Sequence, residues 1–336
     1  MYTIESECLK ILEKINFEPL INKKVLVTGA SGLIGSWMTT CLQLLRETHN
    51  LDIFVWVKND LTKFNFPTEG LNIITKDICD EKSFIDLPNF DVIIHAAGYG
   101  QPSKFLENKI KTIILNTQST INLVQKLNKN GKFLFVSTSE IYSGNYKEKI
   151  TENDFGLTLT NHPRSSYIEG KRCGESICYS FIEQNVNIKI VRLSLAYGPG
   201  TKKGDTRVLN SLIEKALKEN TINLLDSGKA IRTYCYISDV IQMFWNIFLY
   251  GKEKIYNVGG TEKVSIYELA KEIGSLLNVD VNLPKQENSL DGSPNLVNMS
   301  IDRYQEEFGL DSFTTLQEGL QKTINWQKKI YEENKL

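Results

Sequence analysis

Tyr167 and Lys171 lie four residues apart in a segment with a helical pattern, so both side chains are expected on one face of the helix. An ammonium group near a phenol favours the phenolate and lowers the phenol pKa, which would let Tyr167 act as a base near neutral pH. Thr138 follows an apolar run at 133–137, and Glu140 comes two residues later. A chance pairing on a solvated helix is the alternative. The Thr138 hydroxyl, expected in a crevice at the sheet edge, favours catalysis instead.

Three glycines, Gly29, Gly32 and Gly35, follow the apolar run 24–28 and open a helical segment at 33–46. The first two permit a tight turn with room for a pyrophosphate, and Gly35 lets the helix approach the strand closely. The N-terminus of the helix offers free N–H groups and a positive dipole end to phosphates. A simple tight turn is the alternative, but the flanking strand and helix favour a nucleotide cofactor. The predicted cofactor loop comprises Gly29, Ser31, Gly32, Leu33, Ile34 and Gly35.

The end of the second apolar run, 53–57, bears on the choice between NAD and NADP. An acidic residue is expected there in NAD-binding folds, where it bonds the ribose hydroxyls. This chain has Lys58, Asn59 and Asp60, so Lys58 could receive a 2′-phosphate and Asp60 could reach a ribose. We favour NAD over NADP.

The elements that must position these residues alternate between strands and helices. Runs that are apolar throughout, separated by helices, predict a parallel sheet covered on both faces, which right-handed crossovers wind into a doubly wound, Rossmann-like α/β fold. The expected strands are 24–28, 53–57, 72–75, 92–95, 133–137 and 188–193, with helices at 33–46, 105–128 and 165–184. After residue 195 shorter elements follow: helices at 207–219, 238–249, 265–277 and 314–334, and a strand at 222–225.

The change to shorter elements after residue 195 predicts that the chain has three parts. Residues 1–20 form an amphipathic lead-in helix that packs on the body, and residues 21–195 form the NAD-binding domain. Residues 196–336 form a smaller α+β region that binds the substrate, with some segments returning to the large sheet. Ligands of open α/β sheets bind at the carboxyl edge of the strands, where this region is expected to sit.

Composition excludes several classes of protein. The 336 residues carry 39 basic and 40 acidic side chains, so no global field attracts nucleic acid or anionic lipid. Three histidines and six cysteines without a C-x-x-C pair predict no metal site. Cys41, Cys173 and Cys178 are predicted to be small core residues. With no pattern of a signal peptide or membrane span, we expect a cytoplasmic protein.

Four features of the chain together resemble a known family. They are T-G-A-S-G-L-I-G at 28–35, H-A-A-G at 95–98, Thr138 and Tyr167-x-x-x-Lys171. The chain is similar to the extended short-chain dehydrogenases/reductases, in the NAD-dependent epimerase/dehydratase group that acts on nucleotide sugars. Within it, the pattern is most similar to the UDP-glucuronate decarboxylases. The segments that carry this likeness are 101–108, 111–113, 116–117, 137–142, 169–172, 197–199, 207–210, 232–239 and 256–260.

The resemblance implies roles for further residues. Asp77 and Ile78 would flank the adenine, Ala96, Ala97 and Gly98 would line the cofactor, and Asn116 would help hold the active-site helix. Ser139, Arg207 and Arg232 would lie on the substrate side, and the arginines would meet the diphosphate or the sugar; a surface charge is the alternative for each. A homodimer would form through the two long helices at 105–128 and 165–184. Its face would use Ile110, Ile113, Ile114, Ile121 and Val124, for which packing on the sheet is the alternative.

The resemblance also implies a shared first step. Tyr167 would take the proton from a sugar C4 hydroxyl oriented by Thr138, Lys171 would keep Tyr167 ionised and bond the nicotinamide ribose, and the hydride would pass to NAD. The ketone then acidifies C5–H. Glu140 could remove that proton in a 4,6-dehydration, Arg232 could assist loss of CO₂, and re-reduction would give a 4-epimer. Release of the ketone would make a simple dehydrogenase.

The chain differs from the decarboxylase pattern at particular places. Phe105 replaces a tyrosine that touches the sugar carboxylate, Leu195 replaces an asparagine, Gly200 replaces an arginine, and 293–297 lacks the usual basic residues. Ser139 stands where dehydratases carry aspartate, whereas epimerases usually lack the glutamate found here as Glu140. The fate of the ketone, the sugar and the base therefore stay open. A binding protein without catalysis is disfavoured because Thr138, Tyr167 and Lys171 are all present, and a steroid or flavonoid reductase by the likeness after residue 195. The asparagine, lysine and isoleucine content suggests a bacterial role in surface polysaccharide precursors.

Overall fold

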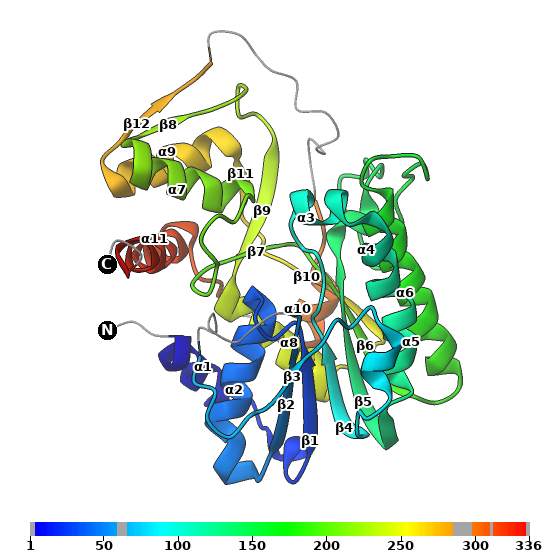
Figure 1. The fold of residues 1–336 in the computed structure, drawn as a ribbon. Coiled ribbons are helices and arrows are strands. Elements are labelled where there is room, and N and C mark those ends of the chain that lie inside the picture. Colours follow the sequence, from blue (N-terminus) through cyan, green and yellow to red (C-terminus); the bar gives the residue numbers. More distant parts are fainter. Residues whose placement is uncertain (1–3, 59–65, 285–297, 310–311, 334–336) are drawn as a thin grey trace.

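The computed structural model describes residues 4–58, 66–284, 298–309 and 312–333. Its centre is a seven-stranded sheet, in which every neighbouring pair is parallel and the order is β10-β6-β5-β4-β1-β2-β3 (Figure 1). Because all strands run the same way, their carboxyl ends meet at one edge. The strands are β1 (Lys24–Thr28), β2 (Asp52–Val57), β3 (Asn72–Thr75), β4 (Phe90–His95), β5 (Leu127–Thr138), β6 (Asn187–Leu193) and β10 (Ile255–Val258).

Alternate residues along the strands bury opposite faces of the sheet. Val25 and Val27 of β1 pack into one hydrophobic cluster, whereas Leu26 between them packs into another. The first cluster lies under α1 (Ile4–Leu12), α2 (Leu33–His49) and α8 (Ile237–Tyr250). The second lies under α4 (Lys109–Asn116), α5 (Gln118–Val124) and α6 (Ser165–Glu183), and a short helix, α3 (Pro102–Glu107), precedes them. These two layers confirm the predicted Rossmann-like α/β fold.

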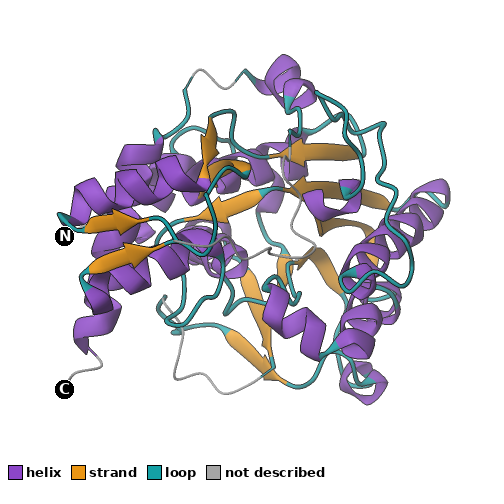
Figure 2. Cartoon of the chain, turned by 90° about the horizontal axis from the view of Figure 1, so that it is seen from above, coloured by secondary structure: helices purple, strands orange, loops and turns teal. Residues whose placement is uncertain are grey.

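A smaller region lies beside the carboxyl edge of the large sheet, as the view from above also shows (Figures 1 and 2). It holds a three-stranded sheet ordered β11-β9-β7 and a two-stranded sheet of β12 and β8. Its elements are β7 (Leu195–Tyr197), α7 (Val208–Glu219), β8 (Thr221–Asn223), β9 (Ile231–Tyr236), β11 (Lys263–Ser265), α9 (Ile266–Leu277), β12 (Asp280–Asn282) and α11 (Leu316–Glu333). Between its pieces, β10 returns to the large sheet beside β6, followed later by α10 (Asp302–Phe308), which packs near β10.

The prediction of one long helix at 105–128 is wrong. The backbone leaves helical geometry at Asn108, with ψ of 48°, and at Thr117, with φ of −113° and ψ of −82°. The chain then enters β5 at Leu127, so the segment forms α3, α4, α5 and the start of a strand. Asparagine and threonine favour such breaks because their side chains bond the nearby backbone. Asn108 Nδ2 bonds the carbonyl of Lys104, and Thr117 Oγ1 bonds that of Ile113.

Two smaller differences concern the termini of elements and a cysteine. The lead-in helix ends at Leu12 and a single 3₁₀ turn, η1 (Glu18–Leu20), follows. Cys173 is exposed on α6, whereas Cys41 and Cys178 are buried as predicted.

None of the helices in the described ranges combines the length and the apolarity that a membrane crossing needs.

Candidate active site

The glycine loop is pressed between its own helix and the end of β4. Gly29 has φ of +69°, and a Cβ there would lie 2.6 Å from Ala97 Cα. A Cβ on Gly35 would lie 2.3 Å from the Gly29 carbonyl oxygen, so α2 can start this close to β1 only with glycine. Gly32 is the exposed N-cap of α2, and the loop thus offers bare backbone and a helix N-terminus at the carboxyl edge. Such a cradle fits the pyrophosphate of a dinucleotide.

A buried histidine fixes the turn that faces this loop. Thr28 and His95 end neighbouring strands in register, and Thr28 Oγ1 lies 2.8 Å from His95 Nδ1. The Ala97 N–H donates to Thr28 Oγ1 at 3.2 Å, which ties the turn of Ala96, Ala97 and Gly98 to β1. Burial, helped by the charge of Lys171, lowers the pKa of His95 to about 3, so its ring is neutral.

The ends of β2 and β3 carry the charged groups of the predicted adenosine side. Asp77 receives a 2.8 Å hydrogen bond from Lys111 Nζ, and Lys58 Nζ lies 3.6 Å from the same carboxylate. Burial opposes ionisation, but these cations and the Cys79 N–H outweigh it and hold the pKa of Asp77 below its ordinary value. Ile78 is buried beside it. Asp60, the alternative ribose ligand, lies outside the described residues.

The structure brings Thr138, Tyr167 and Lys171 together at the carboxyl edge. The last residue of β5, Thr138, lies near enough to Tyr167 to lower the pKa of its phenol, and Thr138 Oγ1 accepts from the Glu140 N–H. Lys171 Nζ donates to the Val136 carbonyl at 2.6 Å. A Cβ built on Gly98 would lie 3.8 Å from that nitrogen, so the amine reaches the cofactor turn.

Burial determines the protonation states of Tyr167 and Lys171. For the protein alone, the expectation that the pKa of Tyr167 is lowered is wrong. Burial and the charge of Glu140 raise the pKa of Tyr167 to about 12, although Thr138, Arg164 and Arg207 oppose the rise. Burial lowers the pKa of Lys171 to about 8, against the attraction of Glu175. Tyr167 is therefore a neutral phenol at neutral pH here, because desolvation destabilises the phenolate more than the nearby cations stabilise it.

Phe105, Arg164 and Glu140 form a cluster around the phenol. The ring of Phe105 stacks on that of Tyr167 with centroids 4.7 Å apart and an interplanar angle of 4°. The Arg164 guanidinium lies 5.2 Å from the centroid of Phe105 and forms an ion pair with Glu140. Sequence reasoning singled out Phe105 and Glu140 but missed Arg164, which stands three residues before Tyr167. That spacing at the start of a helix was the available signal.

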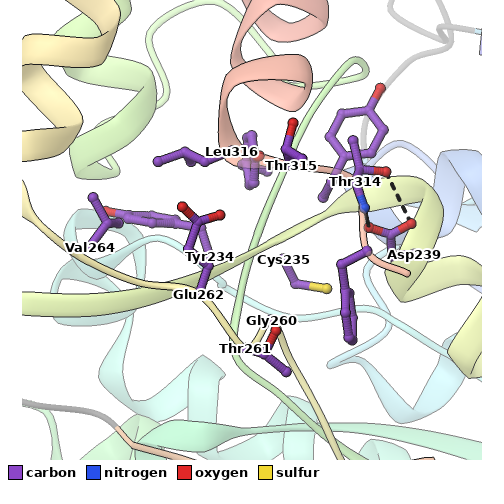
Figure 3. A pocket seen from close by; sticks show the side chains of 13 residues that line it. Tyr234, Cys235, Asp239, Gly260, Thr261, Glu262, Val264, Thr314, Thr315 and Leu316 are labelled. Atoms are coloured by element: carbon purple, nitrogen blue, oxygen red, sulfur yellow. Dashed lines mark hydrogen bonds between the residues drawn. The ribbon is translucent and has the colours of Figure 1, made fainter. Parts of the chain in front are cut away.

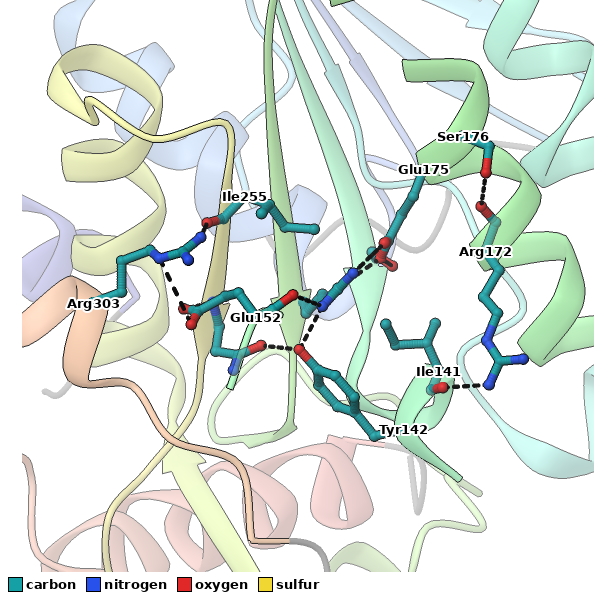
Figure 4. Close-up of polar contacts among 11 residues, drawn as sticks. Ile141, Tyr142, Glu152, Arg172, Glu175, Ser176, Ile255 and Arg303 are labelled. Atoms are coloured by element: carbon teal, nitrogen blue, oxygen red, sulfur yellow. Dashed lines mark hydrogen bonds and ion pairs between the residues drawn. The ribbon is translucent and has the colours of Figure 1, made fainter. Parts of the chain in front are cut away.

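A second arginine–carboxylate pair lies behind the catalytic edge. Arg192 of β6 bonds Glu175 of α6, whose carboxylate also accepts from Ser137 of β5, and Arg192 Nη1 donates to the Tyr142 hydroxyl at 2.6 Å. Figure 4 shows Glu175 and Tyr142 converging there, while Arg172 of α6 bonds the Ile141 carbonyl. Because Glu175 lies one turn after Lys171, this network fixes α6 against β5 and so fixes Lys171 relative to Thr138.

Asn116 lies where α4 packs on α6. It is fully buried, and its Nδ2 donates to the Thr112 carbonyl at 2.7 Å. A Cβ on Gly174 would lie 2.6 Å from the Asn116 carbonyl oxygen, and one on Gly170 would lie 3.5 Å from Asn116 Nδ2. The two glycines let α4 approach the helix that carries Tyr167 and Lys171. Asn116 Oδ1 is buried without a hydrogen-bond partner, at a point where the helix breaks between α4 and α5.

The residues predicted on the substrate side are Ser139, Arg207 and Arg232. Arg207 Nε donates to Asp205 at 3.0 Å, and the charge of Arg207 acts on Tyr167. Arg232 of β9 is buried, and its pKa is lowered by burial and by the charge of Arg164, while Tyr234 opposes the change. Ser139 is half-buried at the start of the 3₁₀ helix η3 (Ser139–Tyr142). The segment 293–297 lies outside the described residues.

A cavity of about 110 Å³ in the smaller region contains none of the predicted site residues. Three tyrosines and Asp239 line it, and Asp239 accepts from the backbone and hydroxyl of Thr314 (Figure 3). Within the described ranges, no cluster of three or more potential metal ligands is present.

Comparison with known proteins agrees with this geometry. The model of the NAD dependent epimerase/dehydratase family matches residues 25–259. UDP-glucuronic acid decarboxylase 1 of Xenopus tropicalis is 27% identical over 316 residues, covering 92% of this chain and 73% of that protein. UDP-glucuronic acid decarboxylase 6 of Arabidopsis thaliana is 28% identical over 304 residues, covering 89% and 87%. A dTDP-glucose 4,6-dehydratase double mutant of Streptomyces venezuelae, solved with NAD bound, superposes with a TM-score of 0.77 at 20% identity, covering 92% of this chain and 98% of that chain. The chain belongs to the NAD dependent epimerase/dehydratase family.

Proposed function

We propose that this enzyme modifies a nucleotide sugar and begins by oxidising the sugar C4 hydroxyl. The observation that carries the proposal is the placement of Thr138, Tyr167 and Lys171 at the carboxyl edge, beside the bare backbone of the glycine loop. Bound NAD would accept the hydride. The residues proposed to hold it are the loop at 29–35, Asp77 and Ile78 at the adenine, and Ala96, Ala97 and Gly98 with Asn116, Tyr167 and Lys171 near the nicotinamide.

The proton of the C4 hydroxyl passes to Tyr167 while Thr138 orients the oxygen. The phenol pKa of about 12 and the lysine pKa of about 8 mean that the pair loses its first proton from Lys171. The reactive form moves the remaining proton from Tyr167 to Lys171, so that a phenolate faces the substrate. Coupled groups titrate as a pair, and this form is available once the pair has lost one proton.

The fate of the ketone divides two candidate reactions. Decarboxylation of UDP-glucuronate is supported by the named relatives. A 4,6-dehydration is favoured by the cluster at the phenol: Glu140 acts on Tyr167, and the apolar Phe105 ring offers no hydrogen bond to a carboxylate. We rank decarboxylation first, with dehydration second and 4-epimerisation or release of the ketone as further outcomes.

A panel of nucleotide sugars tests the proposal. UDP-glucuronate, UDP-glucose, GDP-mannose, dTDP-glucose and CDP-glucose are each incubated with the enzyme and NAD or NADP. Absorbance of the reduced nicotinamide, CO₂ and product mass are followed together. We expect one sugar to be oxidised at C4, more readily with NAD than with NADP. Failure of every sugar to react, or equal turnover by Tyr167→Phe, would overturn the proposal.

The proposal includes a homodimer formed through α4 and α6. Ile110 is 70% exposed and Ile113 is 40% exposed on α4, while Ile114 and Ile121 are half-buried. For Val124 the alternative of packing on the sheet holds, because it is 4% exposed and belongs to the core cluster under the sheet. Light scattering at micromolar concentration should give the mass of a dimer, and a monomer would contradict it. A cytoplasmic role in making surface polysaccharide precursors completes the proposal.

A further inference from the structure

We infer that Arg164 is a positioning residue, which holds the Glu140 carboxylate in place for removal of the C5 proton. The inference rests on the proposed C4 oxidation, because only a C4 ketone makes that proton acidic. It assigns a role to a residue that neither the sequence pattern nor the proposed first step uses.

The geometry of the pair is that of a fork holding a carboxylate. Arg164 Nε donates to Glu140 Oε2 at 2.9 Å, and Arg164 Nη2 donates to the other carboxylate oxygen, Oε1. Two parallel hydrogen bonds fix the plane of the carboxylate as well as its distance, which one bond would not. Arg164 is itself held from a second direction, because its guanidinium lies over the Phe105 ring that stacks on Tyr167. The position of Glu140 is thereby linked to that of the phenol.

The pair is near enough to both the phenol and Arg232 to act on their pKa values. Glu140 and Arg164 both act on Tyr167 through their charges, and both act on Arg232. Glu140 is also tied to Thr138, whose Oγ1 accepts from the Glu140 N–H at 3.2 Å. A sugar with its C4 hydroxyl at Thr138 and Tyr167 and its diphosphate near Arg232 would therefore carry C5 past the carboxylate.

The exposure of the pair distinguishes it from a purely structural ion pair. The side chains of Arg164 and Glu140 are 20% and 26% exposed, whereas those of Arg192 and Glu175 are 10% and 7% exposed. Glu140 opens to the crevice and can exchange a proton with a substrate. Arg172 offers a comparison, since it supports the same 3₁₀ helix through the Ile141 carbonyl without touching the Glu140 side chain.

The step that Arg164 supports is a simple proton transfer. Once C4 has been oxidised to the ketone, for which bound NAD would supply the hydride acceptor, a Glu140 oxygen bonds the C5 proton. The electron pair of the C5–H bond moves into the C4–C5 bond and gives the enolate of the 4-ketone. In a dehydration the C6 hydroxyl then leaves and takes the proton back from Glu140 as water, while in solvent exchange the proton is replaced from water.

The test compares Arg164→Gln, Arg164→Lys and the control Arg172→Gln. Each is incubated in D₂O with the sugar that the wild-type enzyme oxidises in the panel, and the C5 deuterium and the reduced nicotinamide are measured. General-base assistance typically contributes 10²- to 10⁴-fold, and a misplaced base loses part of it, so we expect Arg164→Gln to slow C5 exchange by about 10- to 100-fold. The rate of C4 oxidation should stay within about threefold of the wild-type rate, since the base at C4 is Tyr167. Arg164→Lys should recover part of the exchange, and Arg172→Gln should lower the melting temperature while leaving the ratio of the two rates unchanged.

Equal loss of both rates in Arg164→Gln, or the same ratio as in Arg172→Gln, would overturn the inference. A second measurement needs no substrate. Carbodiimide labelling of Glu140, read by mass spectrometry, should rise several-fold in Arg164→Gln and stay at the wild-type level in Arg172→Gln. If the wild-type enzyme oxidises no sugar, the proposed function fails, and unchanged labelling would then show separately that Arg164 does not hold Glu140.

Discussion

The proposed cofactor side and the proposed substrate side of the site are built in different ways. On the cofactor side, backbone atoms make the surface: Gly29 and Gly35 leave no space for a side chain, and Thr28 and His95 lock the facing turn from below. On the substrate side, long side chains from short elements do so, such as Arg207 before α7 and Arg232 on β9. A surface of closely packed glycine backbone tolerates few substitutions. An arginine side chain, in contrast, can be replaced or can adopt another rotamer. We therefore propose that the second side, rather than the first, selects the sugar.

The largest expected effect comes from the group shared by both sides. Tyr167→Phe should lower kcat by about 10²- to 10⁴-fold, because it removes the proton acceptor at C4. The fold should survive, since the ring that stacks on Phe105 stays and only the phenol hydroxyl is removed. Turnover of the panel sugar and NADH binding are measured together. Near-normal turnover would remove Tyr167 from the mechanism, and loss of NADH binding would reveal a structural role.

Replacing one glycine of the loop by alanine tests whether closely packed backbone atoms form the cofactor side. Gly35→Ala places a Cβ 2.3 Å from the Gly29 carbonyl oxygen, so α2 must shift away from the loop. We expect a loss of about 1–3 kcal/mol of unfolding free energy, typical of overpacking, and about 10- to 100-fold weaker NADH binding. Gly100→Ala is the matched control, because its Cβ would meet no atom within 4 Å. Similar behaviour of the two variants would show that close approach does not shape this side.

The pH dependence of C4 oxidation tests how the pair at the edge shares its proton. Because burial lowers the pKa of Lys171 to about 8, the pair should lose its first proton near that pH. The rate should rise with pH up to about 8 and then level off, since further alkalinity removes no proton until the phenol titrates near 12. Lys171→Met should shift the rise towards the phenol pKa, whereas Arg172→Gln should leave it in place. A rate that falls above pH 8 would mean that the fully protonated pair reacts, rather than the pair that has lost one proton.

The two sides also differ in how far the sequence predicted them. The glycine loop follows its strand without a gap, and Tyr167 and Lys171 are one turn apart, so local spacing was enough to find them. Arg164 bonds Glu140 across 24 residues of sequence, and Arg192 bonds Glu175 across 17. Such pairs depend on how β5, β6 and α6 are stacked. The expected fall in the Tyr167 pKa was wrong for the same reason, because burial is a property of the packed fold rather than of an i, i+4 spacing.

The smallest expected effect concerns the substrate side alone. Arg232→Gln keeps a hydrogen-bonding side chain on β9 but removes its charge from the crevice. A charged hydrogen bond to a diphosphate is worth about 1.5–3 kcal/mol, so KM for the panel sugar should rise about 10- to 100-fold, while kcat stays within about twofold. Arg303→Gln is the control, because Arg303 bonds the Ile255 carbonyl and lies beside Glu152 (Figure 4). A fall in kcat with unchanged KM would instead place Arg232 at the reacting part of the sugar, and it would make this side part of the chemistry rather than of selection alone.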